Sequence, residues 1–247
     1  MTRKEIKFLE GPQSRWKDFK YTISVLFEFI KGFRALHFVG PCVTIFGSAR
    51  FKEDHKYYKQ ARALAAEIAQ LGFTIITGGG PGIMEAANRG AKDVGGKSVG
   101  CNIVLPTEQH PNPYLDKWVN IKYFFIRKTL LIKYSYAFVV MPGGFGTLDE
   151  FYEAVTLVQT KKINMFPIII FDKDFYKEIL KHNENMAKAG TISKEDEHLF
   201  LVTDSIADAI NYIKQKSIIA FGLQYAGRPK PFWGFFEKGI KNIYKKV

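Results

Sequence analysis

Several features that would assign this chain to a specialised class are missing from its sequence. There are 2 cysteines among 247 residues, Cys42 and Cys101, and both lie in apolar runs typical of buried thiols. These two and the 5 scattered histidines give no metal-ligand spacing, so we expect no metal and no disulfide framework. No apolar run reaches the roughly 18 residues of a membrane-spanning helix. The opening residues, M-T-R-K-E-I-K, lack the apolar core of a secretion signal, so we expect a cytoplasmic protein.

Two common phosphate-binding motifs are also absent. The pattern G-x-x-x-x-G-K-[ST] does not occur, which counts against nucleoside triphosphate hydrolysis. A dinucleotide site would need G-x-G-x-x-G after the first expected strand and an acid closing the second. The first turn reads G-S-A-R and the second strand ends in T-G-G-G, so we do not expect a hydride-transfer enzyme.

Positive charge is abundant but confined to the two ends of the chain. Residues 1–40 hold 8 lysines and arginines against 4 acids, and residues 214–247 hold 8 against 1. Since the formal net charge is +12, only +1 remains for the region between them. This distribution argues against a nucleic-acid groove across the main domain, so we expect no nucleic-acid partner.

The region from residue 42 alternates between strand-like and helix-like patterns. We expect strands at 42–46, 73–77, 98–105, 119–124, 137–141, 166–171 and 199–202, and helices at 57–71, within 78–91, at 127–136, from 147, at 175–189 and at 205–216. This alternation predicts an α/β fold, a Rossmann-like doubly wound parallel sheet with helices on both faces. Breaks at Gly47, Gly78, Pro106 and Pro142 follow strands, so they should converge on one crevice.

We divide the chain into an N-terminal helical extension (1–40), a main Rossmann-like domain (41–216) and a basic amphipathic tail (217–247). Residues 14–36 form an amphipathic pattern, with Ser14 as a candidate cap. Its apolar positions are Trp16, Phe19, Ile23, Phe27, Ile30 and Phe33. We favour packing of this stripe on the domain or on a second subunit, with a membrane-surface helix as the alternative. In the tail, the expected apolar face consists of Phe232, Phe236, Ile240 and Ile243, among lysines; weak contact with an anionic membrane surface is one interpretation of it.

The chain is organised around residues 137–150, which read A-F-V-V-M-P-G-G-F-G-T-L-D-E. A buried strand, a glycine turn and a helix start expose backbone N–H groups to a phosphate. Thr147 and Glu150 have the spacing of a capping box, which on its own favours a structural role for Glu150. The glycine turn, together with Arg127 and Lys128 one element earlier, shifts the interpretation towards a catalytic carboxylate.

These residues carry a family resemblance. P-G-G-F-G-T-L-D-E is similar to the P-G-G-x-G-T-x-x-E signature of the Lonely Guy (LOG) family, the cytokinin riboside 5′-monophosphate phosphoribohydrolases. G-G-G-P-G-I-M-E-A-A-N-R-G-A at residues 78–91 resembles the other signature. Some relatives are labelled lysine decarboxylases, but no lysine here is placed as a Schiff-base candidate. The resemblance implies hydrolysis of the N-glycosidic bond of a nucleoside 5′-monophosphate such as AMP, without a cofactor, by a homodimer.

The resemblance also implies roles for individual residues. It places Arg127 and Glu150 as the catalytic pair. The substrate-binding residues that it implies are Ser48, Gly79, Glu108, Lys128, Gly143, Gly144, Phe145, Gly146, Thr147 and Thr156. A carboxylate suits this chemistry because cleavage builds positive charge on the ribose ring. The alternative is a protein that binds or carries a nucleotide or cofactor on the same glycine cradle without turnover.

Overall fold

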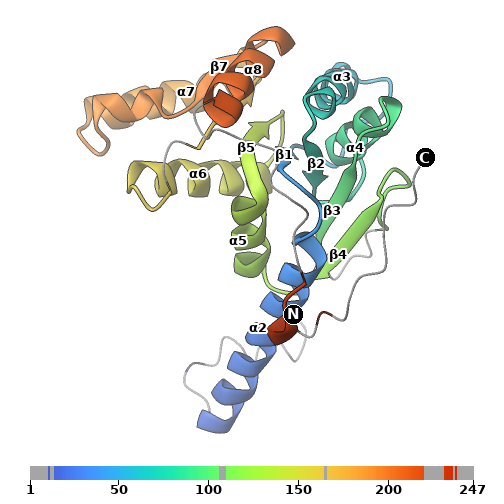
Figure 1. The fold of residues 1–247 in the computed structure, drawn as a ribbon. Coiled ribbons are helices and arrows are strands. Elements are labelled where there is room, and N and C mark those ends of the chain that lie inside the picture. The colour runs from blue at the N-terminus through green and yellow to red at the C-terminus, as the bar shows by residue number, and fades with distance from the viewer. Residues whose placement is uncertain are drawn as a thin grey trace.

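The computed structural model describes residues 11, 14–105, 110–163, 166–219, 231–235 and 237. Within these residues the fold is a seven-stranded sheet in the order β4-β3-β2-β1-β5-β6-β7, and every neighbouring pair is parallel (Figure 1). The strands are β1 (Cys42–Phe46), β2 (Thr74–Thr77), β3 (Ser98–Ile103), β4 (Lys117–Ile121), β5 (Ser135–Val140), β6 (Ile168–Phe171) and β7 (Leu201–Thr203). The predicted fold class is confirmed. Pro106, Glu108 and the tail positions 236, 240 and 243 lie outside the described residues.

Helices cover both faces of the sheet. They are α2 (Arg15–Leu36), α3 (Lys56–Gln70), α4 (Ile83–Asp93), α5 (Phe124–Tyr134), α6 (Phe145–Gln159), α7 (Lys173–Lys188) and α8 (Ile206–Ile213). Successive strand residues point to opposite faces, so one strand contributes to two cores. Val43 and Ile45 pack with α3, α4 and α8, whereas Cys42 and Phe46 pack with α5, α6 and α7. Both faces of the strands are therefore buried, as their apolar runs predicted.

The strand order reverses between β1 and β5. The chain builds β1 to β4 outward in one direction and then returns to place β5 against the other side of β1, with Phe46 beside Val140. Ligands of such sheets bind outside the carboxyl ends of the strands at this switch point. The turns that follow Phe46 and Val140 are therefore the expected walls of a site.

Several element boundaries differ from the sequence prediction, most clearly the two ends of α5. Residues 119–124 were expected to be strand, but β4 ends at Ile121 and Phe124 is the first residue of α5. The helix expected at 127–136 ends at Tyr134, and Ser135 begins β5. The Ser135 hydroxyl lies 2.6 Å from the Thr44 hydroxyl of β1, a buried pairing between strands that local periodicity does not reveal. At the other end of the domain, α8 continues as a π-helical segment, Lys214–Ile219.

Helix α2 packs mainly through a different stripe from the one predicted, although Phe33 of the predicted stripe does lie against the core. Its buried residues are Gly32 and Leu36, and a Cβ at Gly32 would collide with Leu130 of α5. Trp16, Phe19 and Phe27 are exposed instead. Ser14 is the N-cap, but its side chain makes no capping hydrogen bond. Within the described residues, no helix combines the length and apolar character that crossing a membrane requires.

Candidate active site

The turns after β1, β2 and β5 are joined by backbone hydrogen bonds. The N–H of Ser48 donates to Pro142 O at 3.0 Å, and the Ser48 carbonyl accepts from Ile83 N at 2.9 Å. Gly82 sits at φ +70, and a Cβ there would lie 2.5 Å from Ser48 O. The predicted convergence of the breaks at Gly47, Gly78 and Pro142 is therefore what the structure shows.

The turn after β5 exposes the start of helix α6. Gly144 is the N-cap, in extended conformation, and as a glycine it has no side chain that could cap the helix. Gly144, Phe145 and Gly146 are exposed, and a Cβ at Gly144 or Gly146 would meet nothing within 4 Å. The first N–H groups of a helix have no partner inside it and carry the positive end of its dipole. The N–H of Thr147 donates to Gly144 O at 3.0 Å, so the amides that this turn presents to an anion are those of Phe145 and Gly146.

The capping box between Thr147 and Glu150, the structural alternative that the spacing alone favoured, is not formed. Helix α6 begins at Phe145, so Thr147 is its third residue rather than its N-cap. The glycine turn allows the helix to start earlier than the capping pattern suggested. The Thr147 side chain instead fills the space beside Gly143, where a Cβ would collide with it. The carboxylate of Glu150 is consequently not used in capping and points elsewhere.

Glu150 is paired with Arg127. Nη1 of Arg127 lies 2.9 Å from Oε1 of Glu150, and the two side chains are 12% and 5% exposed. Nε of Arg127 donates to Cys101 O of β3 at 2.9 Å, and Nη2 lies 3.0 Å from where a Cβ on Gly78 would be. One guanidinium thus connects β3, the turn after β2 and helix α6. The pair lies at the carboxyl edge of the sheet, which is where the sequence predicted it.

The pKa of Glu150 is shifted strongly upward. Burial raises it to about 7, and the nearby charges of Glu153 and Asp149 add to the rise. Arg127 and Lys128 oppose this shift by favouring the carboxylate. A buried carboxyl group that titrates near neutral pH beside a specific charged partner has the character of a functional group.

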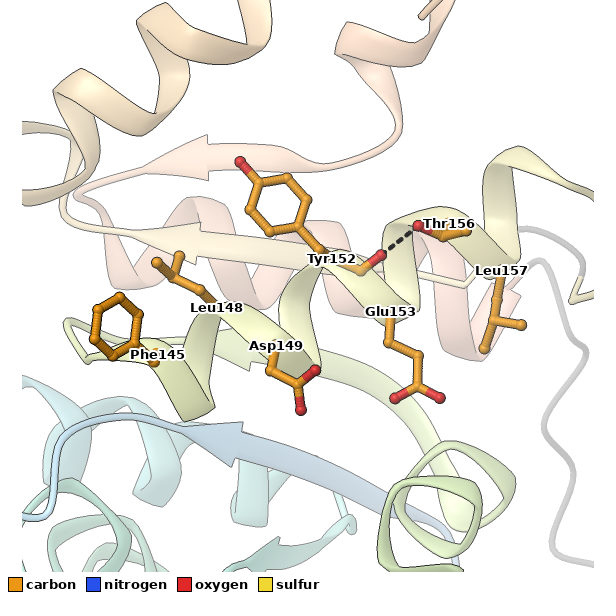
Figure 2. A pocket seen from close by; sticks show the side chains of 7 residues that line it. All are labelled: Phe145, Leu148, Asp149, Tyr152, Glu153, Thr156 and Leu157. Atoms are coloured by element: carbon orange, nitrogen blue, oxygen red, sulfur yellow. Dashed lines mark hydrogen bonds between the residues drawn. The ribbon is translucent and has the colours of Figure 1, made fainter. Parts of the chain in front are cut away.

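Lys128 and Thr156 lie away from the glycine turn. Nζ of Lys128 is 3.2 Å from Oδ1 of Asp149 and 2.8 Å from Oε2 of Glu153, so it ties α5 to α6. Thr156 donates to the Tyr152 carbonyl within α6 at 2.7 Å (Figure 2). It borders an open hollow of about 410 Å³ on the outer face of α6, with Phe145, Leu148, Asp149, Tyr152, Glu153 and Leu157. Figure 2 shows Asp149 and Glu153 pointing to one side of α6 and Tyr152 to the other. Neither Glu150 nor Thr147 lines this hollow.

The turn after β2 is held by a polar network that sequence reasoning missed. Asn112 donates from Nδ2 to Gly80 O and to Asn88 Oδ1, both at 3.0 Å, and its N–H donates to Gly79 O. Thr77 donates to Asn88 and accepts from the N–H of Gly79. Both backbone polar groups of Gly79 are therefore occupied. The sequence feature that could have indicated this role is P-N-P around Asn112, because asparagine between prolines is typical of a turn stabilised by the asparagine side chain.

The remaining predicted residues are placed as follows. The hydroxyl oxygen of Ser48 accepts from the N–H of Arg50 at 3.1 Å, and its backbone joins the turns. Phe145 is 94% exposed at the first position of α6. Among the described residues, no group of three or more histidine, cysteine, aspartate or glutamate side chains is arranged to hold a metal ion.

A parallel doubly wound sheet with an open helix start at its switch point defines a Rossmann-like α/β protein. The family model described as possible lysine decarboxylase matches residues 84–213, just over half of the sequence. The chain belongs to this family, which is the LOG family. The match includes Arg127 and Glu150 but not Ser48 or Gly79.

Curated relatives and solved structures are similar at modest identity. A cytokinin riboside 5′-monophosphate phosphoribohydrolase of Rhodococcoides fascians is 28% identical over 177 residues, 70% of this chain and 88% of the relative. The enzyme LOG3 of Arabidopsis thaliana is 24% identical, over 68% and 79% of the two chains. The molybdenum cofactor binding protein of Rippkaea orientalis has a TM-score of 0.53 at 24% identity, over 71% and 94%. The molybdenum cofactor carrier protein of Chlamydomonas reinhardtii has a TM-score of 0.50 at 25% identity, over 71% and 97%.

Proposed function

We propose that this protein hydrolyses the N-glycosidic bond of a purine nucleoside 5′-monophosphate and releases the free base and ribose 5-phosphate. One observation carries the proposal: the buried carboxyl of Glu150, paired with Arg127, lies in the same helix as the open turn at Gly144. Relatives named as phosphoribohydrolases of a nucleoside 5′-monophosphate support the same chemistry.

The 5′-phosphate would bind the first amides of α6. Gly143, Gly144, Phe145, Gly146 and Thr147 supply the backbone of this turn. Gly146 and Glu150 are separated by one helical turn, so they share a face of α6. From the first residue of the helix to Glu150 the rise is about 8 Å. A ribose ring attached to its phosphate spans such a distance, so phosphate binding would place the sugar beside the carboxyl group.

Glu150 would act as its carboxylate. When the bond between C1′ and the base nitrogen breaks, positive charge develops on the ribose ring, and a fixed negative charge stabilises it. Water then adds to C1′, and the base leaves with a proton. Arg127 keeps a larger fraction of Glu150 ionised at neutral pH, because its charge opposes the effect of burial on the pKa. The phosphate contributes binding energy that positions the reacting bond.

The test is a screen for base release. The purified protein is incubated with AMP, N6-substituted AMP and other nucleoside monophosphates, and free base and ribose 5-phosphate are measured by chromatography. We expect equal amounts of the two products from at least one purine monophosphate and none from the corresponding nucleoside, which lacks the phosphate. Failure of every monophosphate to yield free base would contradict the proposal.

A second candidate is a carrier of a phosphate-bearing cofactor. The similarity to the Chlamydomonas reinhardtii carrier, at 25% identity, favours this function. The open turn is also compatible with it, because exposed amides at a helix start can bind any phosphate ester. Calorimetric titration of the same monophosphates distinguishes the two. Tight binding without any base release would support the carrier, whereas release with turnover would support the hydrolase.

A further inference from the structure

Helix α2 has two apolar faces, and only one of them is covered. Val25, Phe29, Gly32 and Leu36, at spacings of four, three and four, pack towards α5 and the sheet. On the opposite side, at 100° per residue, lies a second stripe, which we name the exposed α2 face. It consists of Trp16, Phe19, Ile23, Leu26, Phe27 and Ile30.

This face is large and apolar. Trp16 and Phe27 are each 62% exposed, Phe19 is 54% exposed and Leu26 is 52% exposed. Trp16 and Phe19 stack with their ring centroids 5.5 Å apart. Figure 1 shows α2 projecting away from the sheet, and the exposed fractions of these side chains place the stripe on the outside of the molecule. A contiguous apolar stripe of this kind marks an interaction site.

The charges beside the exposed α2 face are positive. Lys20 and Arg34 flank it, and Nζ of Lys20 lies 5.4 Å from the Trp16 ring. The acids of α2 point elsewhere: Asp18 pairs with Arg15, and Glu28 accepts from Lys31 and from the N–H of Lys122. The occupant of this face must therefore combine an apolar interior with negative charge.

Phe235 of the C-terminal segment also lies against α2, with its ring centroid 5.9 Å from that of Phe33, a residue outside the exposed α2 face. A second copy of α2 would bring like charges together, and protein interfaces are depleted in lysine. Helices that lie in a membrane surface instead combine lysine and arginine with tryptophan, phenylalanine and leucine.

We propose that the exposed α2 face docks this protein on an anionic lipid surface, with its aromatic side chains between the headgroups. Tryptophan prefers this interfacial depth, and each lysine or arginine near the surface strengthens binding about fivefold. Helix α2 leads into the amino end of β1, whereas the candidate active site lies at the carboxyl ends of the strands. Docking would therefore leave the site accessible, and the proposal does not depend on the reaction.

The experiment is vesicle co-sedimentation of the full chain. Vesicles of phosphatidylcholine alone are compared with vesicles containing phosphatidylglycerol. We expect binding only to the anionic vesicles and a loss of about tenfold or more in the variant Trp16→Ser/Phe27→Ser. The matched control is Ile219→Ser, which removes an apolar side chain that is 74% exposed after α8. We expect it to bind as the wild type does.

Two further experiments test membrane docking even if the double variant does not fold. Lys20→Gln/Arg34→Gln should weaken binding about 25-fold, whereas Lys177→Gln/Lys181→Gln, with the same charge change on α7, should not. With Trp118 and Trp233 replaced by phenylalanine, the emission of Trp16 should move to shorter wavelength when anionic vesicles are added. Absence of wild-type binding, or equal binding by the α2 and control variants, would overturn the proposal. So would a dimer that depends on Trp16 and Phe27 without vesicle binding, since it would identify an interface between copies.

Discussion

The turn after β2 and the turn after β5 are both rich in glycine, yet the protein fills the first and leaves the second open. In the first, Gly78, Gly79 and Gly80 are buried, and Thr77, Asn88 and Asn112 hold the backbone. In the second, Gly144 and Gly146 are exposed at an uncapped helix start. Glycine composition alone therefore does not identify an anion site. What distinguishes the second turn is that no group among the described residues occupies the space beside Gly144 or Gly146.

The largest effect that we expect comes from the carboxyl group beside the open turn. Glu150→Gln should reduce base release about 1000-fold, because a neutral amide does not stabilise positive charge on the ribose. AMP should still bind, since the amides of the turn are unchanged. The measurement is kcat by chromatography together with calorimetric binding. The control is Glu184→Gln, an exposed site on α7, which should keep wild-type kcat. Full activity of the Glu150 variant would remove this residue from the mechanism.

Substitutions in the turn after β2, the filled turn, should lower the stability of the fold rather than change catalysis directly. A Cβ at Gly82 would lie 2.5 Å from Ser48 O, and the residue has φ +70, so Gly82→Val should destabilise the fold by roughly 3 kcal/mol or more. Gly95 has the same φ, but nothing lies within 4 Å of its Cβ position. Gly95→Val should therefore lower the free energy of unfolding only by the cost of the left-handed backbone conformation, about 1–2 kcal/mol. Urea unfolding of both variants measures the difference, and equal losses would show that crowding at the joined turns is unimportant.

The open turn should show the opposite response. Gly146→Ala places a methyl group in free space inside a helix, where alanine is favoured by up to about 1 kcal/mol. Stability should be unchanged or slightly higher, whereas AMP should bind about tenfold more weakly because the methyl group stands where the phosphate approaches. Thermal melting and calorimetric titration test the two effects together. Unchanged AMP affinity would mean that the anion binds elsewhere.

The smallest effect that we expect concerns pH. Since burial raises the pKa of Glu150 to about 7, kcat/KM should rise with pH through that value as the carboxylate forms. Arg127→Met removes a charge that lowers this pKa, so the midpoint of the variant's kcat/KM profile should move to higher pH. The substrate titrates identically in both proteins, so the difference between the two profiles isolates Glu150. Identical midpoints would contradict the role assigned to Arg127.

The same shift predicts a stability trend. A carboxyl group whose pKa is raised in the folded state stabilises the fold below its unfolded value of 4.5, and this contribution is lost as the pH rises towards 7. The free energy of unfolding should therefore fall over this interval in the wild type and change less in Glu150→Gln.

The sequence predicted the order of strands and helices, the edge of the sheet that carries the site, and the glycine turn at Gly144. These features depend on local periodicity and on the general geometry of parallel sheets. It did not predict which side of α2 is buried, because both sides of that helix are apolar and the side that packs depends on contacts with distant residues, such as that between Gly32 and Leu130. Nor did it reveal Asn112, whose partners Asn88 and Gly80 are distant in sequence. The capping box failed because the start of α6 depends on the whole turn and not on one spacing.

The most direct test of the difference between the two turns is an NMR titration of ¹⁵N-labelled Glu150→Gln protein with AMP. The substitution prevents hydrolysis while it keeps the amides of the turn. We expect the largest chemical-shift changes at the backbone amides of Gly144, Phe145, Gly146 and Thr147, with little change at Gly79 and Gly80. Largest changes in the turn after β2, or in the hollow around Tyr152 and Thr156, would contradict the assignment of the anion site.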